Sequence, residues 1–188
     1  MKQELLIGIT ESGVMHTDVD PPIPLETKFQ MVKESGVYDY FDKTPPLELE
    51  DDYRRCSEKY ELPILAGGWF YVLGRDEDLL MENLRLGARL GSLVHNTQIM
   101  MDHQDGSLVS DEQVVEIYLR AYETGEACGC RPTFEVHVNM WSEDFRRIEK
   151  VADLVEKQGI PFRMTLDHSH VIFKIDNPRE QEVFNIRE

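Results

Sequence analysis

Long apolar runs are absent from this sequence. A helix needs roughly 20 consecutive apolar residues to cross a bilayer, and no segment approaches that length. The first apolar run, residues 5–10, is also too short for the core of a signal peptide, and no clean cleavage site follows it. We therefore expect a cytoplasmic protein without a membrane partner.

Basic residues and cysteines are both scarce. The chain of 188 residues has 20 lysines and arginines against 36 aspartates and glutamates, which gives a formal net charge of −16. Such a surface repels phosphate backbones and anionic lipids, which argues against nucleic-acid and membrane partners. The 3 cysteines cannot all pair within one chain, and this favours a reducing compartment.

Two nucleotide-binding motifs are absent as well, since the sequence has neither G-x-G-x-x-G nor a Walker-type lysine loop. Their absence weakens the case for a nucleotide-binding open sheet. The composition itself is ordinary, with 41% hydrophobic and 30% charged residues, which excludes wholesale disorder. No linker or change of composition divides the chain, so residues 1–188 are expected to form a single domain.

Strand-like and helix-like segments alternate along the chain. Helical periodicity predicts helices over residues 24–35 and 47–60. Three further helices are expected: one capped by Asp76, one that begins with the capping-box pattern Ser110-x-x-Gln113, and one that Ser142 precedes. Repeated units of this kind imply a parallel sheet with helical crossovers. The expected strands are residues 5–10, 37–43, 63–72, 92–100, 133–139 and 162–167.

Polar residues inside the strands favour a barrel over an open sheet. A period of two puts Thr133, Glu135 and His137 on one face of their strand, and the polar and apolar faces of residues 163–167 separate in the same way. Carboxylates opposite a helix-covered face are typical of a barrel interior that opens at the C-terminal ends of the strands. We predict an α/β fold, a parallel (β/α) barrel of the TIM type that is incomplete, with about six of the eight units.

Carboxylates and imidazoles gather at the ends of the last two expected strands. Glu135 and His137 lie near the end of the fifth strand, and Asp167 and His170 follow the sixth. Mixed oxygen and nitrogen ligands are accepted by Mn²⁺, Co²⁺, Fe²⁺ or Zn²⁺. Because neighbouring strands lie about 4.8 Å apart, inward Glu135 and Asp167 can share one cation. The alternative is that these acidic residues only cap the loops that follow.

This pattern resembles the xylose isomerase-like barrel superfamily, in residues 134–137 (Phe-Glu-Val-His) and 165–170 (Thr-Leu-Asp-His-Ser-His). The group includes sugar and keto-sugar epimerases, hydroxypyruvate isomerases and inosose dehydratases. Its usual pattern is a metal-binding glutamate that ends strand five and an Asp-x-x-His motif after strand six. The resemblance implies a divalent metal ion (Mn, Co, Mg or Zn) held by Glu135 and Asp167, with Glu135 also moving a proton. It further implies a small sugar or polyol substrate whose hydroxyls His170 contacts.

The sequence also departs from the family pattern. The family completes its metal site with a histidine on strand seven and a glutamate on strand eight, whereas residues 173–188 resemble a loop and a partial helix. We therefore expect at most half of the metal site, with the metal bound weakly or absent unless a partner chain supplies ligands. The open edges of an incomplete parallel sheet lead us to expect a homo-oligomer or a partner chain.

Three further residues are candidates for substrate contact. His137 shares the predicted inner face with Glu135. Trp69, after Gly67 and Gly68, would form a platform for a sugar ring at the barrel rim, or else pack in the core or act as a rim lid. His95 on the fourth strand would face the interior and bond a substrate hydroxyl, and the more common alternative is a hydrogen-bonded structural histidine.

The sequence leaves three functions open. The first is a sugar isomerase/epimerase-like protein, in which a divalent ion polarises a carbonyl and a carboxylate, Glu135, removes the neighbouring carbon-bound proton. The second is a non-catalytic barrel subunit or fragment completed by a partner chain. The third is an endonuclease-IV-like metal nuclease, against which the charge of −16 counts.

Overall fold

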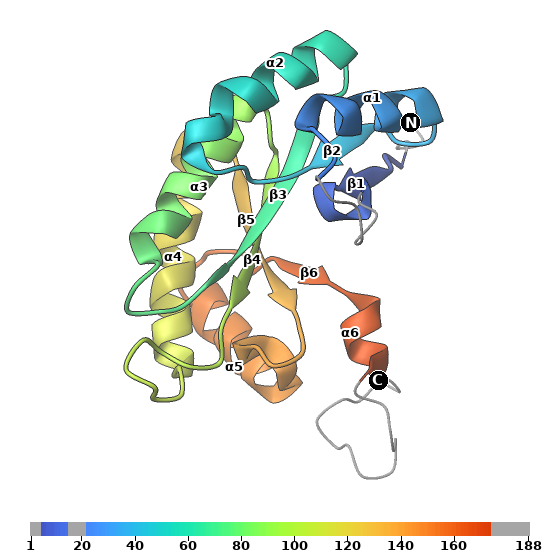
Figure 1. Ribbon diagram of the computed structural model, residues 1–188. Helices are drawn as coiled ribbons and strands as arrows, with labels where there is room; N and C mark the ends of the chain where they lie inside the picture. The colour runs from blue at the N-terminus through green and yellow to red at the C-terminus, as the bar shows by residue number, and fades with distance from the viewer. Residues whose placement is uncertain (1–4, 15–21, 174–188) are drawn as a thin grey trace.

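The computed structural model describes residues 5–14 and 22–173. Among these residues, six strands form one parallel sheet in the order of the sequence, and the sheet curls into part of a barrel (Figure 1). The predicted incomplete parallel barrel is confirmed. The strands are β1 (Gly8–Thr10), β2 (Tyr40–Asp42), β3 (Ile64–Tyr71), β4 (Val94–Ile99), β5 (Arg131–Val136) and β6 (Met164–Leu166).

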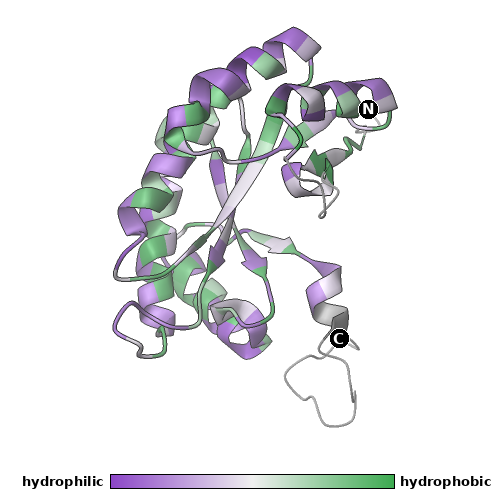
Figure 2. Cartoon of the chain, in the orientation of Figure 1, coloured by the Kyte–Doolittle hydropathy of each residue, from purple (hydrophilic) through white to green (hydrophobic). Residues whose placement is uncertain are grey.

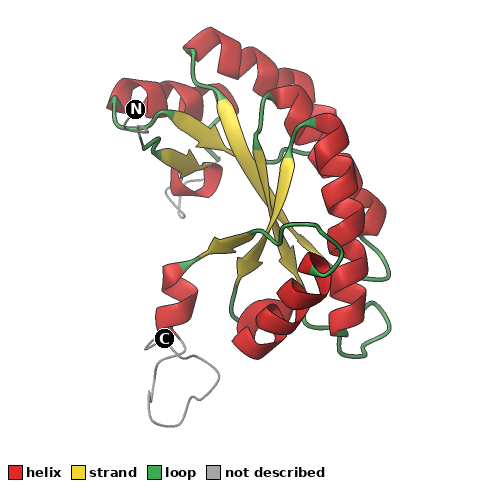
Figure 3. Ribbon diagram, turned by 180° about the vertical axis from the view of Figure 1, so that it is seen from behind, coloured by secondary structure: helices red, strands yellow, loops and turns green. Residues whose placement is uncertain are grey.

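Helices follow the strands and form an arc on the outer side of the sheet, which leaves the inner side open (Figure 3). No helix in the described part of the chain combines the length and apolar character needed to cross a membrane. The helices are α1 (Leu25–Ser35), α2 (Glu50–Tyr60), α3 (Glu77–Leu90), α4 (Asp111–Cys128), α5 (Phe145–Glu156) and α6 (His168–Phe173), with short 3₁₀ segments η1 (Glu11–Val14), η2 (Leu47–Leu49) and η3 (Trp141–Glu143).

The helix ends agree with the sequence at most positions. The capping box at the start of α4 is present, because Ser110 Oγ accepts from the Gln113 N–H at 3.2 Å and Gln113 Oε1 accepts from the Ser110 N–H at 2.8 Å. The helix predicted after Ser142 is present as α5, which begins at Phe145. Ser142 lies in η3, and Asp144 caps the helix by accepting from the Arg146 N–H. The predicted tail lies outside the described residues beyond the end of α6.

The hydrophobic core lies between the sheet and the helices. Apolar and hydrophilic residues alternate along α3 and α4, as amphipathic helices require (Figure 2). One cluster joins β3, β4 and β5 to α3, α4 and α5, where Leu84, Tyr118 and Phe134 are fully buried. A second cluster joins the first strands to α1 and α2, where Phe29 and Phe41 stack with ring centroids 4.4 Å apart.

The pairing of β3 with β4 decides which side chains face the core and which face the open interior. Trp69 and Tyr71 lie opposite Thr97 and Ile99 and share the helix-covered side with them. The alternate positions, among them Phe70, share the inner side with Asn96 and Gln98. The inner side is therefore polar on β4, and it is this side that carries the candidate site.

Candidate functional site

Glu135 is the most enclosed carboxylate on the inner side of the sheet. It is 6% exposed, and Asn96 Nδ2 on the neighbouring strand donates to its Oε2 atom at 2.6 Å. Gln98 Nε2 donates to the same oxygen. Behind it, the Ser142 hydroxyl donates to the backbone carbonyl of Glu135. These contacts from β4 and η3 fix both the backbone and the carboxylate of Glu135.

The two amides that hold Glu135 leave their own oxygens without partners. Asn96 Oδ1 and Gln98 Oε1 are buried and accept no hydrogen bond within the described chain. Their nitrogens must face Glu135, since a carboxylate oxygen only accepts there, so the amide oxygens cannot exchange places with them. Two buried acceptors next to a fixed carboxylate suit a ligand that brings hydroxyl groups.

Asp167 and His170 lie at the junction of β6 and α6, next to Glu135. Asp167 Oδ1 accepts from the backbone N–H of Ser169 at 2.8 Å and from its hydroxyl at 2.6 Å. Partial burial acts to raise the pKa of Asp167, but the Ser169 bonds and the charge of His170 outweigh it, so the pKa lies below its usual value. The Oδ2 atom lies 3.4 Å from Nε2 of His170.

These residues form a three-membered donor cluster. One ligand atom from each of Glu135, Asp167 and His170 lies within 4.8 Å of the other two. His170 Nδ1 is buried and has no hydrogen-bond partner among the described residues. Two carboxylates with one imidazole are a donor set that divalent first-row ions accept. The residues present therefore fit a divalent cation.

A second histidine packs against the first. The rings of His137 and His170 lie with centroids 3.6 Å apart, and Phe70 meets His137 edge-on at 5.8 Å. His137 Nδ1 donates to the Val138 carbonyl at 2.7 Å, since a carbonyl oxygen only accepts. The structure thus brings His137 next to the cluster, on the side where the strands end.

The inner side holds one more carboxylate, Asp42, which sequence reasoning missed. It ends β2 and lines a cavity of about 210 Å³ together with Gly68, Asn96 and Gln98. Burial raises the pKa of Asp42, and the negative charge of Glu135 raises it further. An acidic residue at the C-terminal end of a barrel strand was the signal that could have identified it.

Glu11, at the end of β1, forms a separate buried ion network. Its carboxylate lies 2.6 Å from the Lys28 ammonium and 2.9 Å from that of Lys43, and it accepts from the Tyr53 hydroxyl at 2.8 Å. Burial acts to raise the pKa of Glu11, but these three partners outweigh it and lower the pKa to about 2. The network ties η1 to α1, β2 and α2.

Two predicted substrate contacts lie on the other side of the sheet. His95 is 1% exposed and faces the helices, where it bonds the Tyr71 hydroxyl at 2.7 Å and Thr44 at 3.3 Å. It is therefore the hydrogen-bonded structural histidine expected as the more common alternative, and not an interior residue. Trp69 is 47% exposed, shares the outer side with Tyr71, and lines both a cavity on that side and the cavity that Asp42 lines, so it lies at the rim between them. The register of β3 with β4 places both there, and the inner positions belong to their sequence neighbours.

No family model matches the sequence, and no curated protein matches it. Among solved structures, the 3-keto-D-glucoside 4-epimerase of E. coli superposes with a TM-score of 0.67 at 12% identity, over 93% of this chain and 72% of that one. The D-allulose 3-epimerase of Methylomonas sp. gives 0.68 at 14% identity, over 92% and 66%. The family 2 AP endonuclease of Brucella melitensis gives 0.62 at 13% identity, over 96% and 76%.

The chain thus spans about two thirds to three quarters of the length of these three proteins. At such low identities the likeness concerns the fold. Epimerases and an endonuclease share it, so the fold leaves the reaction open. The described chain has the fold of the xylose isomerase-like TIM barrels, with six parallel strands of that barrel in place.

Proposed function

We propose that the chain acts as a sugar isomerase/epimerase-like protein that moves a proton next to a carbonyl with the assistance of a divalent cation. The observation that carries this proposal is the donor cluster of Glu135, Asp167 and His170, with ligand atoms within 4.8 Å at the C-terminal ends of β5 and β6. Two of the similar solved structures are named as sugar epimerases, which supports the same class of substrate.

The three residues of the cluster would hold Mn²⁺, Co²⁺, Mg²⁺ or Zn²⁺. Such an ion supplies Lewis acidity, which polarises a substrate carbonyl and stabilises the negative charge that develops on its oxygen. The family resemblance implies that His170 contacts substrate hydroxyls, whereas its position in the cluster supports a role as a third metal ligand. Metal affinity of a His170 variant separates the two roles.

Glu135 is the proposed catalytic base. The amides of Asn96 and Gln98 hold its carboxylate in one orientation, so little motion is needed when it takes the carbon-bound proton. Their buried, unpartnered oxygens would accept from substrate hydroxyls. The imidazole of His137 would bind a further hydroxyl, and Phe70 gives an apolar wall behind His137.

Asp42 supplies a second carboxylate on the inner side. Its raised pKa favours the protonated form beside the charged Glu135, so it suits the return of a proton to substrate. Gly68 lines the same cavity, and a side chain at Gly68 would meet the Asn96 carbonyl oxygen at 2.8 Å. The chain therefore has two carboxylates for a two-step proton transfer.

Proton exchange tests this proposal directly. A panel of ketoses and inososes is incubated with the protein and Mn²⁺ in D₂O, and NMR follows deuterium at the carbon next to the carbonyl. We expect exchange with at least one substrate, reduced about 100-fold or more in Glu135→Gln because the base is lost. Glu149→Gln, an exposed position on α5, is the matched control and should exchange as the wild type does.

Two other functions are outcomes of the same experiment. A non-catalytic subunit would show no exchange with any substrate, with or without Mn²⁺. A nuclease would cleave DNA at abasic sites, as the similarity to the Brucella protein would allow, but the net charge of −16 repels a phosphate backbone.

A further inference from the structure

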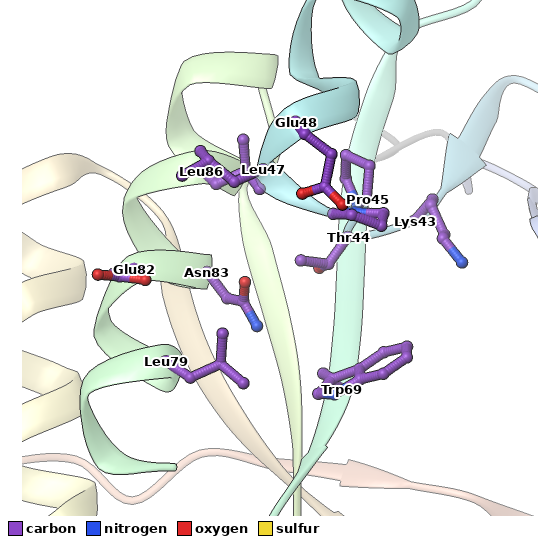
Figure 4. A pocket seen from close by; sticks show the side chains of 11 residues that line it. Lys43, Thr44, Pro45, Leu47, Glu48, Trp69, Leu79, Glu82, Asn83 and Leu86 are labelled. Atoms are coloured by element: carbon purple, nitrogen blue, oxygen red, sulfur yellow. The ribbon is translucent and has the colours of Figure 1, made fainter.

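A second cavity lies on the outer side of the sheet, away from the donor cluster. It has a volume of about 390 Å³ and lies between β3, α3 and the segment that leads into η2 (Figure 4). This volume is within the range of small-molecule pockets, about 300–1,000 Å³. None of the proposed metal ligands lines it. Its apolar walls come from Pro45, Pro46, Leu47, Leu79 and Leu86, with Trp69 at one side.

Two buried polar side chains, Thr44 and Asn83, also line this cavity. They are the ends of a continuous hydrogen-bonded chain beneath it. Asn83 Nδ2 donates to the Tyr71 hydroxyl at 2.8 Å, that hydroxyl lies 2.7 Å from His95 Nε2, and His95 Nδ1 lies 3.3 Å from Thr44 Oγ1. Both ends of this hydrogen-bonded series therefore reach the cavity, and its middle members, Tyr71 and His95, are buried.

Because each buried donor needs an acceptor, the direction of donation along these hydrogen bonds can be assigned. Burial lowers the pKa of His95 to about 3, so the ring is neutral, with one nitrogen donating and the other accepting. The buried Tyr71 hydroxyl accepts from Asn83, and within the described chain its remaining partner is His95 Nε2, so it donates there. His95 Nδ1 then donates to Thr44 Oγ1.

The two ends consequently present complementary groups. The Thr44 oxygen is occupied as an acceptor, so its O–H can donate into the cavity. The side-chain nitrogen of Asn83 donates to Tyr71, and no hydrogen bond to the Asn83 carbonyl oxygen is found among the described residues. Figure 4 shows the Asn83 side chain directed from α3 into the space that Leu79 and Trp69 enclose. The cavity thus offers one donor and one acceptor within apolar walls.

The charges around the cavity select against anions. Glu48 and Glu82 line it, and the one ammonium that lines it, that of Lys43, is 2.9 Å from the Glu11 carboxylate. An anionic ligand would meet two carboxylates without a free cation among the lining residues. The half-exposed indole of Trp69 gives a flat surface on which a ring can lie.

From this arrangement we infer that the outer cavity binds a small uncharged ligand with a flat ring that carries a hydrogen-bond acceptor next to a donor, as in a cyclic or aromatic amide. The acceptor of the ligand receives the Thr44 O–H, its N–H donates to Asn83 Oδ1, and its ring lies against Trp69. No residue of the donor cluster lines this site, so the inference does not rest on the proposed isomerase activity.

Benzamide is the probe that tests this inference, followed by ligand-observed NMR and by tryptophan fluorescence. We expect saturable binding of benzamide and at least tenfold weaker binding of benzoate, which has the same shape but a negative charge and no N–H donor. Asn83→Leu should weaken benzamide about 5- to 10-fold, the effect of one net hydrogen bond, and Trp69→Ala should weaken it as well. Glu135→Gln on the inner side is the control and should bind benzamide as the wild type does.

The inference is wrong if benzamide shows no saturable binding or binds no tighter than benzoate. It is also wrong if Asn83→Leu and Trp69→Ala, with circular dichroism unchanged, bind like the wild type. Should Asn83→Leu fail to fold, Trp69→Ala decides, because that side chain is half exposed and contributes little to the core.

Discussion

Asn96 donates its side-chain amide to Oε2 of Glu135 at 2.6 Å, from one strand of the sheet to the next. Gln98, two residues further along β4, donates to the same oxygen. The position of the proposed base therefore depends on β4 as much as on its own strand. The parallel pairing of β4 and β5 makes this contact possible, since it places alternate residues of both strands on one face.

The first prediction concerns these two positioning amides. Asn96→Leu and Gln98→Leu should each lower the rate of deuterium exchange about tenfold or more, because the carboxylate loses a contact that orients it. Steady-state kinetics should show the loss in kcat more than in KM, since substrate can still enter. Gln158→Leu, exposed beyond α5, is the control. A loss confined to KM would assign the amides to substrate binding alone.

The second prediction concerns the Glu11 network and pH. Glu11→Gln should lower the free energy of unfolding at pH 7 by roughly 3 kcal/mol, because Lys28 keeps its charge in a buried position. The folded pKa of Glu11, about 2, lies below the unfolded value, so its contribution is present above pH 4.5 and is lost as pH falls toward 2. Urea unfolding should show a smaller difference between variant and wild type at pH 3 than at pH 7. An equal difference at both pH values would contradict this account.

The third prediction concerns Asp42, where the sign is opposite. Burial and the charge of Glu135 raise its pKa, so the fold favours the protonated form and loses stability as pH rises through that pKa. Asp42→Asn should therefore raise the urea midpoint at pH 7, with a smaller gain at pH 4. The same variant should slow deuterium exchange at least tenfold if Asp42 returns a proton. A variant that is stabilised and fully active would remove Asp42 from the mechanism.

The fourth prediction concerns association. In the described chain, β1 and β6 each pair with one neighbour, and two apolar side chains there are exposed: Ile7, which precedes β1, by 48%, and Leu166, which ends β6, by 53%. Unpaired edges with apolar flanks favour association, so we propose a homo-oligomer or a complex with a partner chain. Light scattering measures the mass in solution, and a monodisperse monomer at high concentration would contradict this proposal.

The strand order and the meeting of Glu135 with Asp167 could be predicted from sequence. Short apolar runs separated by amphipathic helices define successive parallel strands, and parallel strands end at the same edge of the sheet. That rule brings the two carboxylates together without knowledge of any side-chain contact. It also applies to Asp42, but β2 spans 3 residues, too few for an alternation that would mark its inner face.

Which side chains of β4 point to the helices and which point inward could not be predicted, because both faces of the strand carry polar residues. His95 and Thr97 point to the helices, whereas Asn96 and Gln98 point inward. Hydrophobic alternation assigns a face only when one side is apolar. For Trp69, the register with β4 sets which side the residue occupies, and no local pattern records that register. The positions of His95 and Trp69 followed from pairing that only the structure shows.

Mn²⁺ titration followed by electron paramagnetic resonance tests the donor cluster most directly. We expect the wild type to bind one equivalent of Mn²⁺, and Glu135→Gln, Asp167→Asn and His170→Ala each to weaken binding at least tenfold, while Glu149→Gln leaves it unchanged. Absence of binding by the wild type, or equal affinity in all three cluster variants, would contradict the central claim that these residues together hold a divalent cation.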